Sequence, residues 1–236
     1  MAAFFSTFTA SEPDDDGDII TEVELTITNG TPGPIHRIYF RSLLLGDQDA
    51  CFEGVDSYED AFLAPAESST ISLGSSVNQR EVQESSISIK ATGQLCRRDY
   101  ALLGELPIPE PGESMRLHQQ PNFDWCNKSL TVFFSRTETD SDGDFNLEYK
   151  CLIGNVGTQH LKSVIFRAVL IDSEGIEIED KEHEEEIQAE SSIFISDYFY
   201  RPKASQLVGG KVIFSIKALV PVERFEASET TSLADD

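Results

Sequence analysis

Apolar and polar residues alternate along two stretches of the chain, residues 16–46 and residues 142–172. The alternating apolar positions are Val23, Leu25 and Ile27 in the first stretch and Tyr149, Cys151 and Ile153 in the second. A period of two is typical of a strand that turns one face to a core and the other to solvent. Each stretch is therefore predicted to contain such a strand.

The two stretches are also similar to each other in sequence. They align without a gap at a constant offset of 126, so that position 16 corresponds to position 142. The alignment has nine identical pairs among 31, which are Asp16/Asp142, Gly17/Gly143, Asp18/Asp144, Glu22/Glu148, Ile27/Ile153, Asn29/Asn155, Phe40/Phe166, Arg41/Arg167 and Leu44/Leu170. An internal repeat of this length predicts two domains of one fold, each with about 100 residues and its own core.

A second pair of alternating strands follows within the repeat. Residues 38–45 match residues 164–171, and the alternation directs Arg41 and Arg167 outward. Each half also opens with a Phe-Phe-Ser triplet, followed by an acidic turn with Asp-Gly, which is typical of a hairpin. No run of a dozen residues has the period of a helix, so the fold class is predicted to be all-β.

Prolines suggest where the two halves are joined. Four of the ten prolines fall within residues 105–128, which predicts an extended linker, partly packed because it also contains apolar residues. The predicted organisation is a first β-sandwich over 1–104, the linker over 105–128, a second β-sandwich over 129–227 and a flexible acidic tail over 228–236.

About seven short strands in each unit predict a sandwich of immunoglobulin type. An Asn-Gly or Asn-Val-Gly turn, a Phe-Arg strand and a later Ala-Glu-Ser-Ser turn (Ala66 to Ser69) follow one another in order. This order resembles the bacterial and archaeal immunoglobulin-like modules of the CARDB and FxLYD kind. The resemblance implies two tandem immunoglobulin-like β-sandwich domains that serve interaction and scaffolding rather than catalysis.

The net charge of −24, from 42 acidic and 18 basic residues, narrows the choice of partners. Binding a phosphate backbone or an anionic membrane surface requires clustered Lys and Arg, so we expect no nucleic acid partner and no membrane insertion. A solubilising surface, a binder of cations or basic partners, and an acidic inhibitor that mimics nucleic acid remain as interpretations.

The duplicated Asp-rich turns are the candidate metal site. The carboxylates at alternate positions are Asp14, Asp16 and Asp18 in the first copy and Asp140, Asp142 and Asp144 in the second. Ca²⁺ prefers such oxygen clusters, but the spacing departs from the EF-hand pattern. The alternative is an acidic hairpin turn in which Asp binds its own backbone and Gly takes a positive φ. Ca²⁺ is thus the one cofactor considered.

The repeat also duplicates an acid–base pair. Glu22 with Arg41, and Glu148 with Arg167, occupy outward positions of strands that follow each other in the chain. If these strands are neighbours, each pair is expected to form a cross-strand ion pair of structural character. The functional alternative is an arginine that binds an anionic partner.

The four cysteines have no matching framework in the two halves, so reduced thiols are expected, with a Cys51–Cys96 disulfide left open as an alternative. Cys151 occupies an alternating apolar position and is predicted to be a core residue. The first residues lack the charged and apolar regions of a secretory signal. A cytoplasmic location is therefore favoured, and a secreted or surface location is the alternative.

No motif for catalysis accompanies these patterns. The four histidines lie in no metal-binding spacing, and neither a nucleophile elbow nor a phosphate-binding glycine loop is present. We therefore expect no enzyme, but a protein-binding or structural module whose partners are proteins, including copies of itself. Outward aromatic residues within 191–200 are a candidate binding patch. A Ca²⁺-stabilised adhesion module at the cell surface is the alternative, and the nucleic acid mimic is the second.

Overall fold

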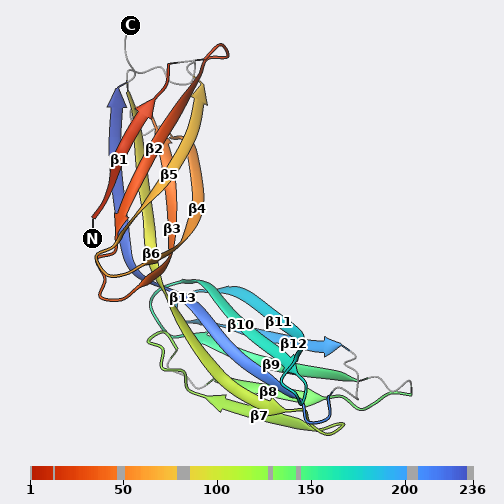
Figure 1. Ribbon diagram of the computed structural model, residues 1–236. Helices are drawn as coiled ribbons and strands as arrows, with labels where there is room; N and C mark the ends of the chain where they lie inside the picture. Colours follow the sequence, from red (N-terminus) through yellow and green to blue (C-terminus); the bar gives the residue numbers. More distant parts are fainter. Residues whose placement is uncertain are drawn as a thin grey trace. The chain divides into compact units, whose positions relative to one another are not determined.

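The computed structural model describes residues 2–12, 14–46, 51–78, 86–126, 130–141, 145–200 and 207–232. The elements that these residues form are all strands (Figure 1). They are β1 (Ala2–Ala10), β2 (Asp18–Thr28), β3 (Ile35–Leu45), β4 (Cys51–Leu63), β5 (Ser68–Asn78), β6 (Ser86–Pro107), β7 (Ser114–Gln119), β8 (Leu130–Arg136), β9 (Asn146–Asn155), β10 (Leu161–Ile171), β11 (Glu177–Ile187), β12 (Ser191–Tyr200) and β13 (Lys211–Ser232). The predicted all-β class is confirmed.

The strands form three antiparallel sheets, with the orders β1-β2-β5, β12-β9-β8-β7 and β11-β10-β13-β6-β3-β4. The chain divides into two compact units, of which unit 1 comprises Met1–Arg97 and Pro221–Asp236, and unit 2 comprises Arg98–Val220. The long strands β6 and β13 each give one half to unit 1 and the other half to unit 2. In the sequence, unit 2 is therefore an insertion between the two segments that form unit 1.

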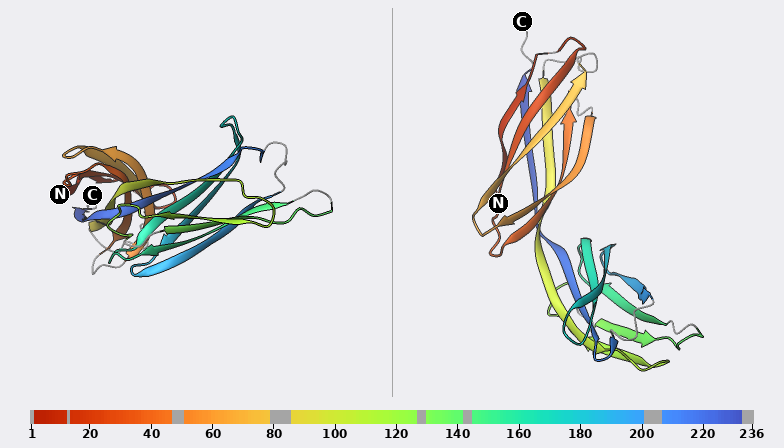
Figure 2. Two further views of the ribbon diagram at one scale, coloured as in Figure 1. Left: turned by 90° about the horizontal axis from the view of Figure 1, so that it is seen from below. Right: turned by 45° about the vertical axis from the view of Figure 1, so that its right-hand side comes forward.

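Each unit consists of two layers of strands with an apolar core between them (Figure 2). In unit 1, β1-β2-β5 faces β3, β4 and the adjoining halves of β6 and β13. In unit 2, β12-β9-β8-β7 faces β10, β11 and the other halves of β6 and β13. The alternating residues named from the sequence are all buried, as the period of two predicts.

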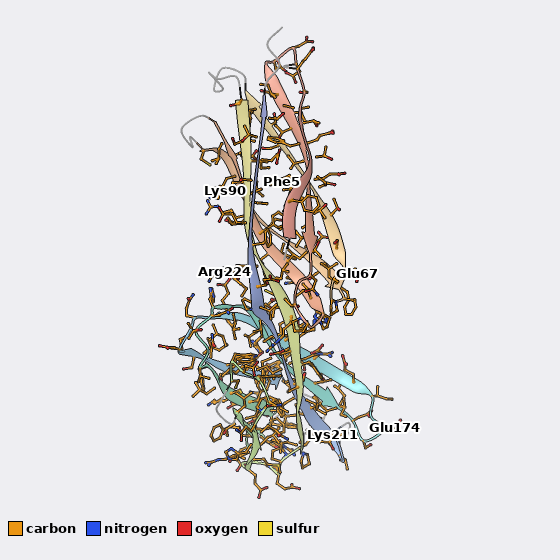
Figure 3. All side chains as sticks on the ribbon, turned by 90° about the vertical axis from the view of Figure 1, so that its left-hand side faces the viewer. Phe5, Glu67, Lys90, Glu174, Lys211 and Arg224 are labelled. Carbon is orange, nitrogen blue, oxygen red and sulfur yellow. The ribbon has the colours of Figure 1, made fainter. Side chains whose placement is uncertain are left out.

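The core of unit 1 includes a side chain from the end of the chain. Phe225 on β13 is 5% exposed and belongs to the cluster that contains Leu25 and Phe40. Its ring packs directly against Gly93 on β6, where a Cβ would clash with the ring. Lys90 on β6, labelled in Figure 3, binds Glu226 at 2.7 Å. These contacts fasten the last strand into unit 1.

The core of unit 2 is built around aromatic rings. The ring centroid of Tyr149 lies 5.7 Å from that of Phe199 and 5.9 Å from those of Phe166 and Phe214. Phe134 meets Phe214 edge-on at 5.9 Å. Rings at these separations stabilise each other beyond the area that they bury.

The division into units differs from the one predicted from the sequence. Residues 105–128 lie within unit 2, where β7 pairs with β8 along its whole length. Trp125 is buried there and donates a hydrogen bond from Nε1 to Asp99 at 3.1 Å, while Phe123 stacks on its ring. Residues 228–232, predicted to be part of a flexible tail, form the end of β13. The prolines thus flank a strand instead of forming a spacer.

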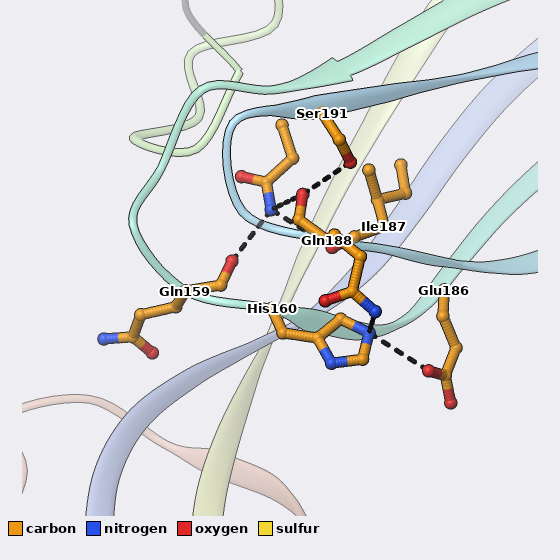
Figure 4. Close-up of polar contacts among 7 residues, drawn as sticks. Gln159, His160, Glu186, Ile187, Gln188 and Ser191 are labelled. Atoms are coloured by element: carbon orange, nitrogen blue, oxygen red, sulfur yellow. Dashed lines mark hydrogen bonds and ion pairs between the residues drawn. The ribbon is translucent and has the colours of Figure 1, made fainter.

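Two buried asparagines hold equivalent turns in the two units. Asn29 donates from Nδ2 to the carbonyls of Gly33 and Leu63, both at 2.9 Å. Asn155 donates from Nδ2 to the carbonyls of Gln159, Ile187 and Gln188, as Figure 4 shows. In each case Oδ1 accepts from the backbone two residues further on, at Thr31 and Gly157. Each asparagine thereby joins the end of one strand to two turns.

Candidate interaction surface

The outer face of the sheet β12-β9-β8-β7 carries large apolar side chains. Alternate residues of these strands fill the core of unit 2, so the residues between them point outward. Phe194, Leu152 and Phe133, one on each of β12, β9 and β8, are 64%, 57% and 43% exposed. Tyr198 and Tyr200 continue the face along β12 and are about half exposed. We call these five residues the aromatic face.

The strand register brings the members of the aromatic face together. Phe194 lies directly opposite Leu152 on the neighbouring strand. Leu152 lies opposite Thr131, and Phe133 is two residues further along the same strand. It is therefore a diagonal neighbour of Leu152 on the same side of the sheet. The apolar surface is continuous across three strands, and it is not a set of scattered residues.

Cations lie beside and within the aromatic face. Arg116 on β7 lies opposite Phe133, with its Cζ 4.9 Å from the ring centroid. Lys150 on β9 lies between Phe133 and Ser196 of β12, and His118 is two residues beyond Arg116 on β7. Glu148 is the one acidic side chain that points outward from these four strands as the structure describes them. This surface is thus apolar and cationic, although the chain carries −24 overall.

A polar cluster lies on the opposite side of β12, within the sandwich. Oδ2 of Asp197 is 3.1 Å from Nε2 of His183 on β11, and the same nitrogen is 3.0 Å from the Tyr149 hydroxyl. Burial raises the pKa of the Tyr149 phenol, and nearby carboxylates, Asp197 first, raise it further. Asp197 is the only charged residue of β12. Because it points inward, the aromatic face of this strand carries no charge.

Asp14 and Asp16 lie in the turn between β1 and β2, and Asp18 is the first residue of β2. Oδ1 of Asp14 accepts hydrogen bonds from the backbone nitrogens of Asp16 at 3.0 Å and Asp18 at 2.9 Å. Gly17 has a φ of 83°, in the left-handed region. These are the features of the acidic hairpin turn that the sequence offered as the alternative to a metal site.

The second Asp-rich turn is described only in part. Asp140 is exposed, and Asp142 and Asp144 lie outside the described residues. Within the described part of the chain, no three His, Cys, Asp or Glu side chains are grouped so that they could hold a metal ion. The Ca²⁺ hypothesis therefore stays a prediction.

The structure does not form the ion pairs predicted from the sequence, Glu22–Arg41 and Glu148–Arg167. Consecutive strands β2 and β3 belong to different sheets, and so do β9 and β10. The two residues of each predicted pair therefore point outward from opposite sides of the sandwich. Arg167 instead binds Asp180 on β11, with Nη2 2.7 Å from Oδ2, and this hydrogen bond raises the pKa of Arg167. The Nε of Arg41 lies 4.0 Å from Oδ1 of Asp56 on β4.

The four cysteines are free thiols. Cys51 lies opposite Leu45 and Cys96 opposite Arg37, so the two are separated by eight positions along β3. At about 3.3 Å per residue this is roughly 26 Å, whereas a disulfide requires Cα atoms within about 7 Å. The Cys51–Cys96 alternative is therefore wrong. Cys151 is a core residue as predicted, and burial raises its pKa to about 12.

A small cleft opens in unit 1 between the edge strands β4 and β5. Its lining mixes apolar side chains, such as Val23, Leu44 and Ile89, with hydroxyl groups and the carboxylate of Glu53. At the rim, Ser75 donates a hydrogen bond from Oγ to the carboxylate of Glu53. The lining contains one carboxylate and no His, Cys or Lys, so it does not provide paired groups for acid–base or nucleophilic catalysis.

Sequence reasoning found one part of the aromatic face and missed another. The outward aromatics of residues 191–200 were expected, whereas Phe133 and Leu152 were not. Both are apolar at positions where the alternation of their strands calls for an exposed residue. An apolar residue out of phase with a clear alternation was the feature that could have revealed them.

Comparison with known proteins assigns no family. No protein-family model and no curated protein matches the chain. Among solved structures, it is similar to pT26-6p (8% identity, TM-score 0.28), covering 91% of this chain and 65% of that one. It is similar to a red sea bream transglutaminase at 8% identity and a TM-score of 0.24, covering 98% of this chain and 31% of that one. It is also similar to the C-terminal globular domain of an oligosaccharyltransferase from Pyrococcus abyssi at 9% identity and a TM-score of 0.24, covering 97% of this chain and 47% of that one. The chain thus spans less than two thirds of each of these proteins.

The described residues include no helix long and apolar enough to cross a membrane.

Proposed function

We propose that this chain is a non-catalytic protein-interaction or assembly module, built from two immunoglobulin-like sandwiches that arose by duplication. The observation that carries the proposal is the aromatic face, where Phe133, Leu152 and Phe194 form a continuous exposed apolar surface across three strands. Contiguous surfaces of this kind are typical of protein-binding sites, because their desolvation by a partner is favourable. Aromatic residues and arginine are enriched at such sites.

Two structural correspondences support the duplication. Asn29 and Asn155, which are aligned in the sequence repeat, make equivalent hydrogen bonds to strand ends and turns. Ala66 and Glu190, which lie in the turns that precede β5 and β12, both take positive φ values, 66° and 54°. Non-glycine residues seldom adopt this conformation, so its presence at matching turns supports a common origin.

The polar cluster in unit 2 supports a role without catalysis. Tyr149 is fully buried, so a substrate has no access to the phenol that His183 contacts. The Tyr149 hydroxyl, the His183 imidazole and the Asp197 carboxylate instead satisfy one another's hydrogen-bonding groups between β11 and β12. A Ca²⁺-stabilised surface module is the alternative function, and a calcium titration distinguishes the two.

Selection of random peptides displayed on phage tests the proposed function. We expect peptides enriched on the purified chain to bind the Leu152→Lys variant at least about tenfold more weakly, because the lysine places a charge in the middle of the aromatic face. Ile20→Lys is the matched control, since Ile20 is 51% exposed on β2 of unit 1. Peptides that bind Leu152→Lys as tightly as they bind the wild type, or a selection that enriches none, would contradict the proposal.

A further inference from the structure

Strand β12 is an open edge of the sheet that carries the aromatic face. It pairs with β9 through all ten of its residues without a shift in register, and it stands last in the order β12-β9-β8-β7. An exposed edge offers a row of unpaired backbone donors and acceptors, which proteins usually protect with charges, bulges, Pro or short strands. Apart from the inward-pointing Asp197, β12 has none of these protections.

The other edges in the described part of the chain differ from β12. Strand β11 is dominated by Glu and Asp, and β4 carries several carboxylates and shifts in register. Strand β1 also has a shift in register, and β7 has only six residues. Strand β5 is uncharged, but its outward positions are Ser, Thr and Gly, which provide no large side chains to pack across a junction. Edge pairing is therefore favoured at β12.

The sequence of β12 suits antiparallel pairing with itself about a two-fold axis. Its outward residues are, in order, Ser192, Phe194, Ser196, Tyr198 and Tyr200. With Ser196 at the axis, Phe194 of each copy stands opposite Tyr198 of the other, and the small serines meet at the centre. Cross-strand aromatic pairs of this kind stabilise antiparallel sheets. A two-fold arrangement forms each such contact twice.

Charge points to the same partner. Two chains of net charge −24 repel each other over most of their surfaces, so association requires a contact region with little charge. On β12 the carboxylate of Asp197 points inward and contacts His183. On the adjacent strand, Lys150 and Glu148 point outward with opposite signs. The β12 edge thus avoids the repulsion that the rest of the acidic chain imposes.

We infer that the partner at this edge is a second copy of the chain, joined through antiparallel pairing of the two β12 strands. The inference rests on the proposed function, because it names a partner for the sheet that carries the aromatic face. The joined sheet has eight strands, four from each copy. Its outer surface carries two aromatic faces side by side.

Sedimentation equilibrium of the full chain over a range of concentrations tests the inference. The wild type is expected to dimerise, and Ser196→Lys to raise the dissociation constant at least about tenfold, because two lysines then meet at the axis. Ser196→Thr, which keeps a small uncharged residue that favours strands, is expected to dimerise like the wild type. Melting temperatures check that each variant is folded.

The outcomes separate the inference from the proposed function. Leu152 lies on β9, so Leu152→Lys is expected to lose peptide binding but to keep the dimer. A wild type that stays monomeric, or a folded Ser196→Lys variant that dimerises normally, overturns edge pairing and leaves the aromatic face intact. A dimer abolished by Leu152→Lys places the contact on the face and also overturns edge pairing. Peptide binding that Leu152→Lys leaves unchanged overturns the proposed function alone.

Discussion

Asn29 and Asn155 lie 126 positions apart and close corresponding corners of two sandwiches with the same amide geometry. Each is at most 1% exposed. The amides donate to the carbonyl of Leu63 in unit 1 and to those of Gln159 and Ile187 in unit 2, while Gly33 and Gln188 also accept from the hydroxyls of Thr31 and Ser191. The identity of this pair in the sequence repeat thus has a structural cause. Alanine at either position would remove the hydrogen bonds that the buried amide makes.

We expect Asn155→Ala to lower the free energy of unfolding by about 1–3 kcal/mol, the usual cost of buried polar groups left without a partner. Urea unfolding followed by the fluorescence of Trp125, which also lies in unit 2, measures the effect. Gly154→Ala is the control, because nothing lies within 4 Å of the Cβ that it adds. An Asn155→Ala variant as stable as the control would show that the hydrogen bonds contribute nothing.

The partner of Arg167 can be identified by a double-mutant cycle. We expect Arg167→Ala and Asp180→Asn to couple by about 0.2–1 kcal/mol, since both side chains are partly exposed and such pairs contribute little. Arg167→Ala and Glu148→Gln should be additive, because these residues lie in different sheets. Coupling between Arg167 and Glu148 would support the pairing predicted from the sequence instead.

Phe225→Ala should destabilise unit 1, even though Phe225 lies 128 positions beyond Arg97, where the first segment of that unit ends. Removal of a buried phenylalanine costs about 3–5 kcal/mol. Amide hydrogen exchange of β3 reports on unit 1, while the fluorescence of Trp125, the chain's single tryptophan, reports on unit 2. We expect a large loss of protection in β3 and a smaller change in the fluorescence transition. Unchanged protection in β3 would argue against the assignment of the last strand to unit 1.

Alkaline pH should destabilise the fold through its buried thiols. Burial raises the pKa of Cys96 and Cys151 from 9.0 to about 12. Between these values the unfolded chain releases protons that the folded chain retains, so stability falls as pH rises, by up to about 1.4 kcal/mol per pH unit for each thiol. Cys151→Val should remove the contribution of Cys151 to this fall of stability with pH. Equal slopes for the variant and the wild type, measured by urea unfolding from pH 8 to pH 11, would contradict the assignment.

Calcium should leave the melting temperature unchanged, because the Asp14 carboxylate already binds the backbone of its own turn. Asp14→Ala should lower stability by about 0.5–1.5 kcal/mol per hydrogen bond lost, with or without calcium. Differential scanning fluorimetry with Ca²⁺ and with a chelator makes the comparison. A rise in melting temperature that requires Ca²⁺ and disappears in Asp14→Ala would establish the metal site.

Alternation along the chain was sufficient to identify strands and their buried faces. Val23, Leu25 and Ile27 point inward as predicted, and so do Tyr149, Cys151 and Ile153. Alternation does not say which strands are neighbours, because it depends on residues close in the sequence, whereas strand pairing joins residues far apart in the sequence. Glu22 and Arg41 are therefore predicted from the sequence to form an ion pair, although their strands lie in different sheets.

The path of the last strand was equally hidden from local patterns. Nothing in the sequence around Pro221 indicates that residues after it complete the first unit. The prolines around β7 suggested a spacer, although Met115 and Leu117 alternate with polar residues between them. The aromatic face was foreseen only on β12, because its other members needed the register of β8 and β9 to bring them together.

The insertion of unit 2 into unit 1 has a consequence for synthesis on the ribosome. Residues up to Arg97 are synthesised before unit 2, but the half of β13 that pairs beside β6 in unit 1 begins only at Pro221. Domains usually fold from the N-terminus as they emerge. Here the inserted unit is complete before the enclosing one, so residues up to Arg97 must wait, with an open sheet edge, until the residues after Val220 have been synthesised.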